Sequence, residues 1–223
     1  MNDTTIAAQV ARMHASTDAT QADAAASPFA REQAALGFAG VPAGVAAPGV
    51  RVPDADVLDV DGQPRKLFDV LEGRRAVIVL YRGAWCPYCN LTLSTYQRVL
   101  LPQLRTRGVS LVAISPQNPD GSLTMREKHS LEFAVVSDPG NAVARALGVL
   151  TAPSDDVRRA QLDGGLDLTQ VNADGTTGLP MPTTVVVDAE GVIRWIDVHP
   201  DYSSRSEPAE IVAAVDGLPG GTP

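Results

Sequence analysis

The chain has little cysteine: its 223 residues contain only Cys86 and Cys89, spaced as Cys-x-x-Cys. Two cysteines placed at random would take this spacing about one time in a hundred, so the pair indicates joint chemistry. In the cytosol a lone Cys-x-x-Cys is seldom a permanent staple and is more often catalytic or metal-binding. The three histidines are scattered without metal-ligand spacing to the cysteines, so we expect no metal site.

The chain also lacks a basic cluster. It carries 18 Lys and Arg against 26 Asp and Glu, a net charge of −8, and its pI is about 4.8. These values argue against nucleic acid as a partner. The acidic residues are spread along the chain, which favours solubility rather than attraction of a specific partner.

Targeting signals and long apolar runs are missing as well. The first five residues show neither a basic region nor an apolar run of the secretory type. Residues 33–50 carry no charge, but several glycines and prolines interrupt them, which is typical of a linker and unsuited to a membrane span. We therefore expect a cytoplasmic protein without a membrane partner.

What is present suits one good-sized core with an attached arm, since 44% of the residues are hydrophobic and the mean hydropathy is near zero. We expect residues 1–49 to be a helical arm and a Pro/Gly linker, with a loosely ordered extension as the alternative. Residues 50–217 form the predicted globular domain, with an insertion at about 151–180. Residues 218–223 form a disordered tail.

The globular part alternates between strand and helix patterns. The apolar runs 76–81, 109–114 and 183–187 predict buried strands. Asp61-Gly62 predicts a hairpin between 57–60 and 63–67. The other expected elements are short strands at 133–136 and 192–198, and helices at 67–71, 87–101 (ended by Pro102), 122–130, 141–147, 157–162 and 208–215. This order predicts an α/β fold, a central mixed β-sheet with helices on both faces.

The position of the cysteines predicts their chemistry. Pro87 suits the first position of a helix, which places Cys86 at the N-cap, facing the free N–H groups of the first turn. The helix dipole there favours a thiolate, so we expect a lowered pKa for Cys86. Cys89 lies one turn along, where it can attack a mixed disulfide on Cys86.

Residues 81–90 read Tyr-Arg-Gly-Ala-Trp-Cys-Pro-Tyr-Cys-Asn, which resembles the signature of the thioredoxin-fold superfamily. In detail the motif resembles the peroxiredoxin-like branch of the AhpC/TSA family (alkyl hydroperoxide reductase and thiol-specific antioxidant). Further matches lie at 52–54, 61–62, 136–141 and 187–194, so the resemblance covers about residues 50–217. It implies a thioredoxin-like fold with an N-terminal β-hairpin.

The resemblance also implies roles for residues near the next strand. Pro182 just before a buried strand is the expected cis-proline facing the dithiol, with an ordinary edge-strand proline as the alternative. The backbone at Met181 is expected to bind extended thiol substrates. Thr183 and Trp85 are expected to line the same groove.

The peroxidases of this family carry a Pro-x-x-x-Thr-x-x-Cys motif and a distant arginine. Aligned on this chain, the peroxide-attacking cysteine is Cys89, the threonine position is Cys86 and the proline position is Arg82. The arginine position, counted back from Asp188, is Pro182. Because these changes remove groups that orient the peroxide, they favour thiol–disulfide exchange over peroxidase chemistry.

The remaining positions of the motif refine the hypothesis. Pro87-Tyr88 is the dipeptide found between glutaredoxin cysteines and indicates a less reducing potential than that of thioredoxin. Arg82 either stabilises a thiolate or is a solvated loop arginine. Leu80 stands where thioredoxin has a buried acid, so the sequence identifies no proton shuttle for Cys89.

We therefore expect a thiol-based oxidoreductase in which Cys86 is the nucleophile and Cys89 resolves, with no cofactor besides a redox-active Cys86–Cys89 disulfide. Its expected partners are protein thiols and disulfides or low-molecular-weight thiols, and the arm could mediate a homodimer. One alternative is a peroxiredoxin-like peroxidase acting on hydrogen peroxide or alkyl hydroperoxides. Another is a non-enzymatic redox sensor.

Overall fold

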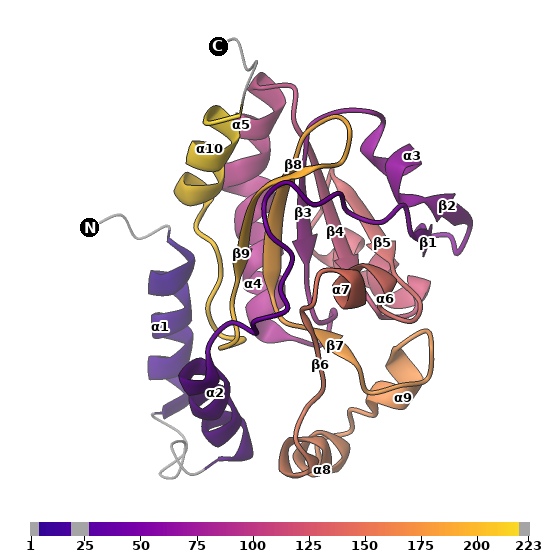
Figure 1. Ribbon diagram of the computed structural model, residues 1–223. Helices are drawn as coiled ribbons and strands as arrows, with labels where there is room; N and C mark the ends of the chain where they lie inside the picture. Colours follow the sequence, from indigo (N-terminus) through magenta and orange to yellow (C-terminus); the bar gives the residue numbers. More distant parts are fainter. Residues whose placement is uncertain (1–4, 19–26, 219–223) are drawn as a thin grey trace.

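The computed structural model describes residues 5–18 and 27–218 and builds them around a mixed seven-stranded sheet of order β2-β1-β5-β4-β3-β8-β9 (Figure 1). The strands of this sheet are β1 (Asp56–Leu58), β2 (Pro64–Lys66), β3 (Ala76–Leu80), β4 (Ser110–Ser115), β5 (Ala134–Ser137), β8 (Thr183–Val187) and β9 (Ile193–Val198). Strand β3 pairs parallel with β4 and antiparallel with β8. The predicted mixed sheet and its N-terminal hairpin, β1 with β2, are confirmed.

The two faces of the sheet bury two separate clusters, because successive strand residues point to opposite sides. Val77 and Val79 of β3 contribute to one cluster, and Ile78 and Leu80 contribute to the other. Helices cover both faces (Figure 1). They are α1 (Ile6–Asp18), α2 (Pro28–Ala39), α3 (Leu67–Leu71), α4 (Pro87–Thr95), α5 (Leu101–Thr106), α6 (Pro119–Lys128), α7 (Ala142–Ala146), α8 (Asp155–Asp163), α9 (Leu168–Val171) and α10 (Pro208–Asp216).

The helix that follows the cysteines is longer than predicted. It does not end at Pro102 but continues from α4 through a π-helical segment, Tyr96–Leu100, into α5. The wider turn lets the N–H of Leu101 bond to the carbonyl of Tyr96, and Pro102 then falls in the first turn of α5. A proline there forfeits no hydrogen bond, so the helix passes it.

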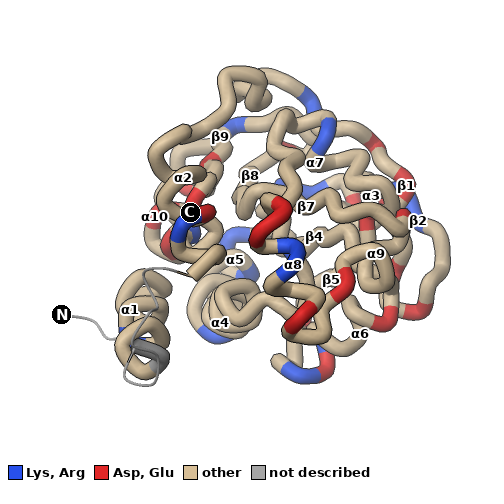
Figure 2. The backbone as a smooth tube through the Cα atoms, turned by 90° about the horizontal axis from the view of Figure 1, so that it is seen from below, with Lys and Arg blue, Asp and Glu red and all other residues tan. Residues whose placement is uncertain are grey.

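The segment 151–180 leaves the sheet and returns through a short ribbon. Strand β6 (Leu150–Thr151) pairs antiparallel with β7 (Leu179–Pro180), and α8 and α9 lie between them. Figure 2 shows acidic and basic positions interleaved along α8, in keeping with the ion pair between Arg159 and Asp156. A second ion pair joins Asp156 to Arg31, so α8 is held against α2.

The first helix is fastened to the body of the protein. Ile6 and Val10 are buried in the same cluster as the two cysteines. The N–H groups of Ile6 and Ala7 donate to the carboxylate of Glu207 at 2.9 and 2.8 Å, and the same side chain caps α10. One carboxylate therefore serves the N-termini of two helices that are about 200 positions apart in sequence.

At the C-terminal end, Leu218 was predicted to belong to the disordered tail but is buried in the cluster that contains the two cysteines. The rest of the predicted tail, 219–223, lies outside the described residues. Among the helices that the structure describes, none is long and apolar enough to cross a membrane.

Candidate active site

The two cysteines follow β3 as the sequence predicted, with Cys86 at the N-cap of α4 and Cys89 one turn along. The N–H of Cys86 bonds to the carbonyl of Gly83 at 3.1 Å, which closes a tight turn before the helix. Gln117 fastens this turn, because its side chain accepts from the N–H of Ala84 and donates to the hydroxyl of Tyr81, both at 2.8 Å. Both thiols are free and buried.

The sulfur of Cys89 is surrounded by hydrogen-bond donors. Nη2 of Arg205 lies 3.3 Å from Cys89 Sγ, and the thiol of Cys86 and the backbone of Arg82 also act to lower the pKa of this sulfur. Cys86, by contrast, makes no side-chain bond to the first turn of α4. The donors therefore converge on the second cysteine of the motif.

This arrangement reverses the expected acidity of the pair. Burial alone would raise the pKa of the Cys89 thiol, but the Cys86 thiol and the Arg205 charge outweigh it and lower that pKa to about 5. Burial, together with donation to Cys89, raises the pKa of Cys86 well above its usual value. The prediction that the helix dipole lowers the pKa of Cys86 is wrong, because burial and the neighbouring Cys89 raise it instead.

Arg205 is the functional residue that the sequence did not reveal. Its Nη1 donates to the carbonyls of Tyr202 and Ser204 at 2.7 and 2.6 Å, so the guanidinium is fixed within its own loop. The loop is anchored in turn by the hydroxyl of Tyr96, which donates to the carbonyl of Ser206 at 2.7 Å. One signal was available, since Arg205 is the only Lys or Arg between residue 195 and residue 223.

A cavity of about 800 Å³ lies beside the dithiol. Its described lining residues are Met13, His14, Ser27, Phe29, Ala30, Gln33, Arg82, Trp85, Cys86, Pro87, Tyr88, Gln161, Leu166 and Tyr202. Five predicted site residues are thus brought together here: Arg82, Trp85, Cys86, Pro87 and Tyr88. Cys89 is fully buried behind them.

Helices α1 and α2 cover this cavity through contacts to two tyrosines. The hydroxyl of Tyr88 lies 2.9 Å from Nε2 of His14 and accepts from Gln33 at 3.4 Å. The hydroxyl of Tyr202 donates to the carbonyl of Phe29 at 3.3 Å. The guanidinium of Arg82 stacks on the Tyr202 ring, 3.9 Å from its centroid. The N-terminal helices therefore form part of the site.

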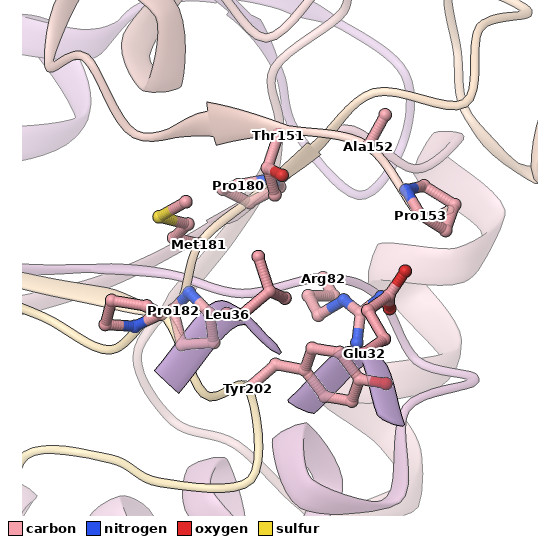
Figure 3. Close-up of a pocket in the computed structure, with 11 residues that line it drawn as sticks. Glu32, Leu36, Arg82, Thr151, Ala152, Pro153, Pro180, Met181, Pro182 and Tyr202 are labelled. Atoms are coloured by element: carbon pink, nitrogen blue, oxygen red, sulfur yellow. The ribbon is translucent and has the colours of Figure 1, made fainter. Parts of the chain in front are cut away.

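The residues predicted around Pro182 are placed differently. Figure 3 shows Met181 and Pro182 beside a hollow that Glu32 and Leu36 of α2 also line. The volume of this hollow is about 10 Å³, room for about one water molecule. The bond between Met181 and Pro182 is trans, like every peptide bond of the described residues, so the predicted cis-proline is wrong.

The backbone N–H and carbonyl of Met181 both have hydrogen-bond partners within the protein. Its N–H donates to the carbonyl of Val149 at 2.8 Å, and its carbonyl accepts from the hydroxyl of Thr183 at 2.9 Å. The ribbon of β6 and β7 makes the first of these bonds possible by leading the chain straight into β8. Met181, Pro182 and Thr183 are therefore absent from the described lining of the dithiol cavity.

Comparison with known proteins places this chain in a family. The model of the AhpC/TSA family matches residues 48–196. Peroxiredoxin Bcp of Escherichia coli K12 is 30% identical over 97 residues, 44% of this chain and 61% of its own length. A Mycobacterium tuberculosis protein, provisionally named a peroxiredoxin, is 34% identical over 101 residues, 45% of this chain and 63% of its own. The chain thus spans less than two thirds of these relatives.

Solved structures agree on the fold. Peroxidoxin BcpB of Mycobacterium tuberculosis superposes with a TM-score of 0.58 at 20% identity, over 77% of this chain and 97% of that one. Reduced Prx3 of Vibrio vulnificus, in complex with hydrogen peroxide, gives 0.61 at 20% identity, over 76% and 99%. These likenesses confirm the thioredoxin-like fold of peroxiredoxins. Because the family model covers more than half of the residues, the chain belongs to the AhpC/TSA family.

Proposed function

We propose that the protein is a thiol peroxidase in which Cys89 attacks the peroxide and Cys86 resolves the product. The contact of 3.3 Å between Arg205 Nη2 and Cys89 Sγ carries the proposal. A guanidinium in that place holds the sulfur as a thiolate and stabilises the charge that develops as the O–O bond breaks. The relatives named above support it, since they are called peroxiredoxins.

Two other residues of the site take the roles of the threonine and arginine that the family motif has and this chain lacks. Cys86 stands at the threonine position of the family motif and, like a hydroxyl there, donates to the attacking sulfur. Arg205 comes from the loop before α10 instead of from position 182. Cys86 and Arg205 therefore compensate for the sequence changes that favoured disulfide exchange.

The two sulfurs supply both electrons that reduce the peroxide. The Cys89 thiolate forms an S–O bond to the terminal peroxide oxygen while the O–O bond breaks, and the departing alkoxide takes from solvent the proton that Cys89 released on ionisation. The sulfur of Cys86 then attacks Cys89, an S–S bond forms, and the hydroxyl leaves with the Cys86 proton as water. One hydroperoxide and two thiols give one alcohol, one water and one disulfide.

Thiol–disulfide exchange is the second candidate. It is favoured by the position of Cys86, which lines the cavity wall, whereas Cys89 does not. In that case Cys86 would be the nucleophile, as the sequence predicts, and Cys89 would resolve. The two candidates therefore assign the attacking sulfur differently.

A single turnover of the reduced protein separates them. Cys89→Ser should abolish the peroxide-dependent change in tryptophan fluorescence, whereas Cys86→Ser should keep it and accumulate a sulfenic acid on Cys89 that dimedone labels. Rapid peroxide consumption by Cys89→Ser, or none by the native protein, would overturn the proposal. Mixed disulfides with protein partners trapped on Cys86 in Cys89→Ser would support the exchanger, and the absence of both activities would favour the redox sensor.

A further inference from the structure

Both cysteines are buried, at 1% and 0% exposure, but only Cys86 contributes to the described wall of the cavity beside the dithiol. A thiol that enters the cavity therefore meets Cys86 first. If the pair is oxidised, attack on Cys86 expels Cys89, whose sulfur lies next to the Arg205 guanidinium. A stabilised leaving thiolate makes this direction of attack the faster one.

The cavity wall carries one cation and no described carboxylate. Arg82 is 6% exposed, and none of the ion pairs that the structure describes engages its guanidinium. It is held by stacking, 3.9 Å from the centroid of Tyr202 and 5.3 Å from that of Trp85. Glu32 lies beside Arg82 in the neighbouring hollow (Figure 3), but in the described part of the chain the two form no ion pair. The guanidinium therefore retains N–H groups for an anionic ligand, above all a carboxylate that can accept two N–H bonds.

A second polar group in the wall has no partner among the described residues. Gln161, 5% exposed, lines the cavity from α8, and its Oε1 accepts no hydrogen bond there. A buried amide oxygen without a donor costs free energy. Because this oxygen is inaccessible, the Gln161 side chain must turn toward the cavity before a ligand N–H can recover that cost. The remaining walls are mainly apolar and aromatic, including Phe29 and Tyr88. The wall thus calls for a carboxylate, an N–H donor and a compact body.

The cover over the cavity sets the size of the ligand. Contacts from α1 to Tyr88 and from α2 to Tyr88 and Tyr202 place helices above Cys86. A volume of about 800 Å³ falls in the range of small-molecule sites. The flat surface that surrounds the cysteines of a protein dithiol would meet these helices before its sulfur reached Cys86.

Building on the proposed function, we propose that this cavity binds the reductant of the Cys86–Cys89 disulfide, a small cysteine-derived thiol whose carboxylate pairs with Arg82 and whose N–H faces Gln161. Its thiolate attacks Cys86, forms a mixed disulfide and releases Cys89 as a thiolate. A second molecule of the same thiol attacks the bound sulfur and leaves as the small disulfide. Two thiols are oxidised and one protein disulfide is reduced.

The test compares two probes that differ in one charge, N-acetylcysteine and N-acetylcysteine amide. The protein is oxidised with diamide rather than peroxide, so the result does not depend on peroxidase activity. Each reduction rate is divided by the rate of the same thiol with 2-hydroxyethyl disulfide, which corrects for thiol reactivity. We expect a preference of about tenfold for the carboxylate in the native protein, as one charge-assisted contact provides.

Two variants test whether Arg82 causes this preference for the carboxylate. Arg82→Gln should remove it, and Arg158→Gln, which deletes the same charge from the exposed side of α8, should keep it. Equal rates for the two probes in the native protein would overturn the proposal even if Arg82→Gln does not fold. So would a preference that survives in Arg82→Gln, or faster reduction by thioredoxin than by either probe at equal thiol concentration. Failure of the peroxide single turnover would instead count against the proposed function alone.

Discussion

Residues 86 and 89 show what a short motif specifies and what it leaves open. The spacing identified both cysteines, the N-cap and the helix. It did not identify which thiol is acidic, because that depends on the contact between the two thiols and on Arg205, which lies 116 positions further along the chain. The residues of a motif indicate the local helix and therefore its dipole. A guanidinium from a distant loop reaches the motif only in the folded chain, so the motif does not indicate it. At this short range the charge outweighs the dipole.

Arg205→Gln should therefore move the acidity of Cys89. In the native protein the peroxide rate should be nearly constant above pH 6 and fall as the pH drops through about 5, since only the thiolate reacts. Without the guanidinium the pKa should rise toward the ordinary value of about 8.5, so the rate at pH 7 should fall at least about tenfold. The thiolate absorbance at 240 nm, followed against pH in Cys86→Ser, reports the same shift.

Arg194→Gln is the matched control, because Arg194 forms its ion pair with Asp188 on the surface. This variant should leave the pH profile unchanged. An unaltered pKa of Cys89 in Arg205→Gln would contradict the assignment of the charge. The stability of the folded state should decrease as the pH falls from about 8.5 to about 5, since the unfolded thiol takes up its proton in this range and the folded thiol does not.

Among the elements, strands and helices with strong patterns were predicted well and their junctions were not. The runs that form β3, β4 and β8 are apolar throughout, so burial on both faces was evident. Pro102 was misinterpreted because a sequence does not show the wider turn at Tyr96–Leu100 that accommodates it. The predicted cis-proline failed for a related reason: the β6–β7 ribbon, which decides the path into β8, has only two residues in each strand.

Glu207 offers a test at this scale, since its carboxylate accepts from Ile6 and Ala7 and also caps α10. Glu207→Gln should lower the free energy of unfolding by about 1 kcal/mol, because a charged acceptor at two helix N-termini is replaced by a neutral amide. Hydrogen exchange should increase in α1 first. Glu127→Gln, on the exposed side of α6, should change neither quantity; equal effects from both variants would refute the role of Glu207.

In the whole molecule, the N-terminal helices, the sheet and the segment 151–180 meet at one cavity. The sequence suggested an arm and an insertion but not their meeting, since contacts such as His14 with Tyr88 join elements without a shared pattern. The division into domains, the homodimer and the cytoplasmic location stay predictions from the sequence.

Access to the thiols should consequently depend on the size of the reagent. Iodoacetamide should modify the reduced protein much faster than a maleimide carrying a long polyethylene glycol chain, because α1 and α2 cover Cys86. The double variant His14→Ala/Gln33→Ala should narrow this difference, since it removes both contacts to the Tyr88 hydroxyl. Phe38→Ala, at a 96% exposed position of α2, should leave the difference between the two rates unchanged. Mass spectrometry of the modified protein over time measures both rates, and a native protein equally open to both reagents would refute the cover.

The distance in sequence between Cys89 and Arg205 has a consequence during biosynthesis. While the chain emerges, the sulfur at 89 is an ordinary, mostly protonated thiol that reacts slowly with oxidants. It becomes acidic only after the 116-position loop has closed and the segment before α10 has docked. Reactivity is thus withheld until folding is nearly finished, which protects the nascent polypeptide from premature oxidation.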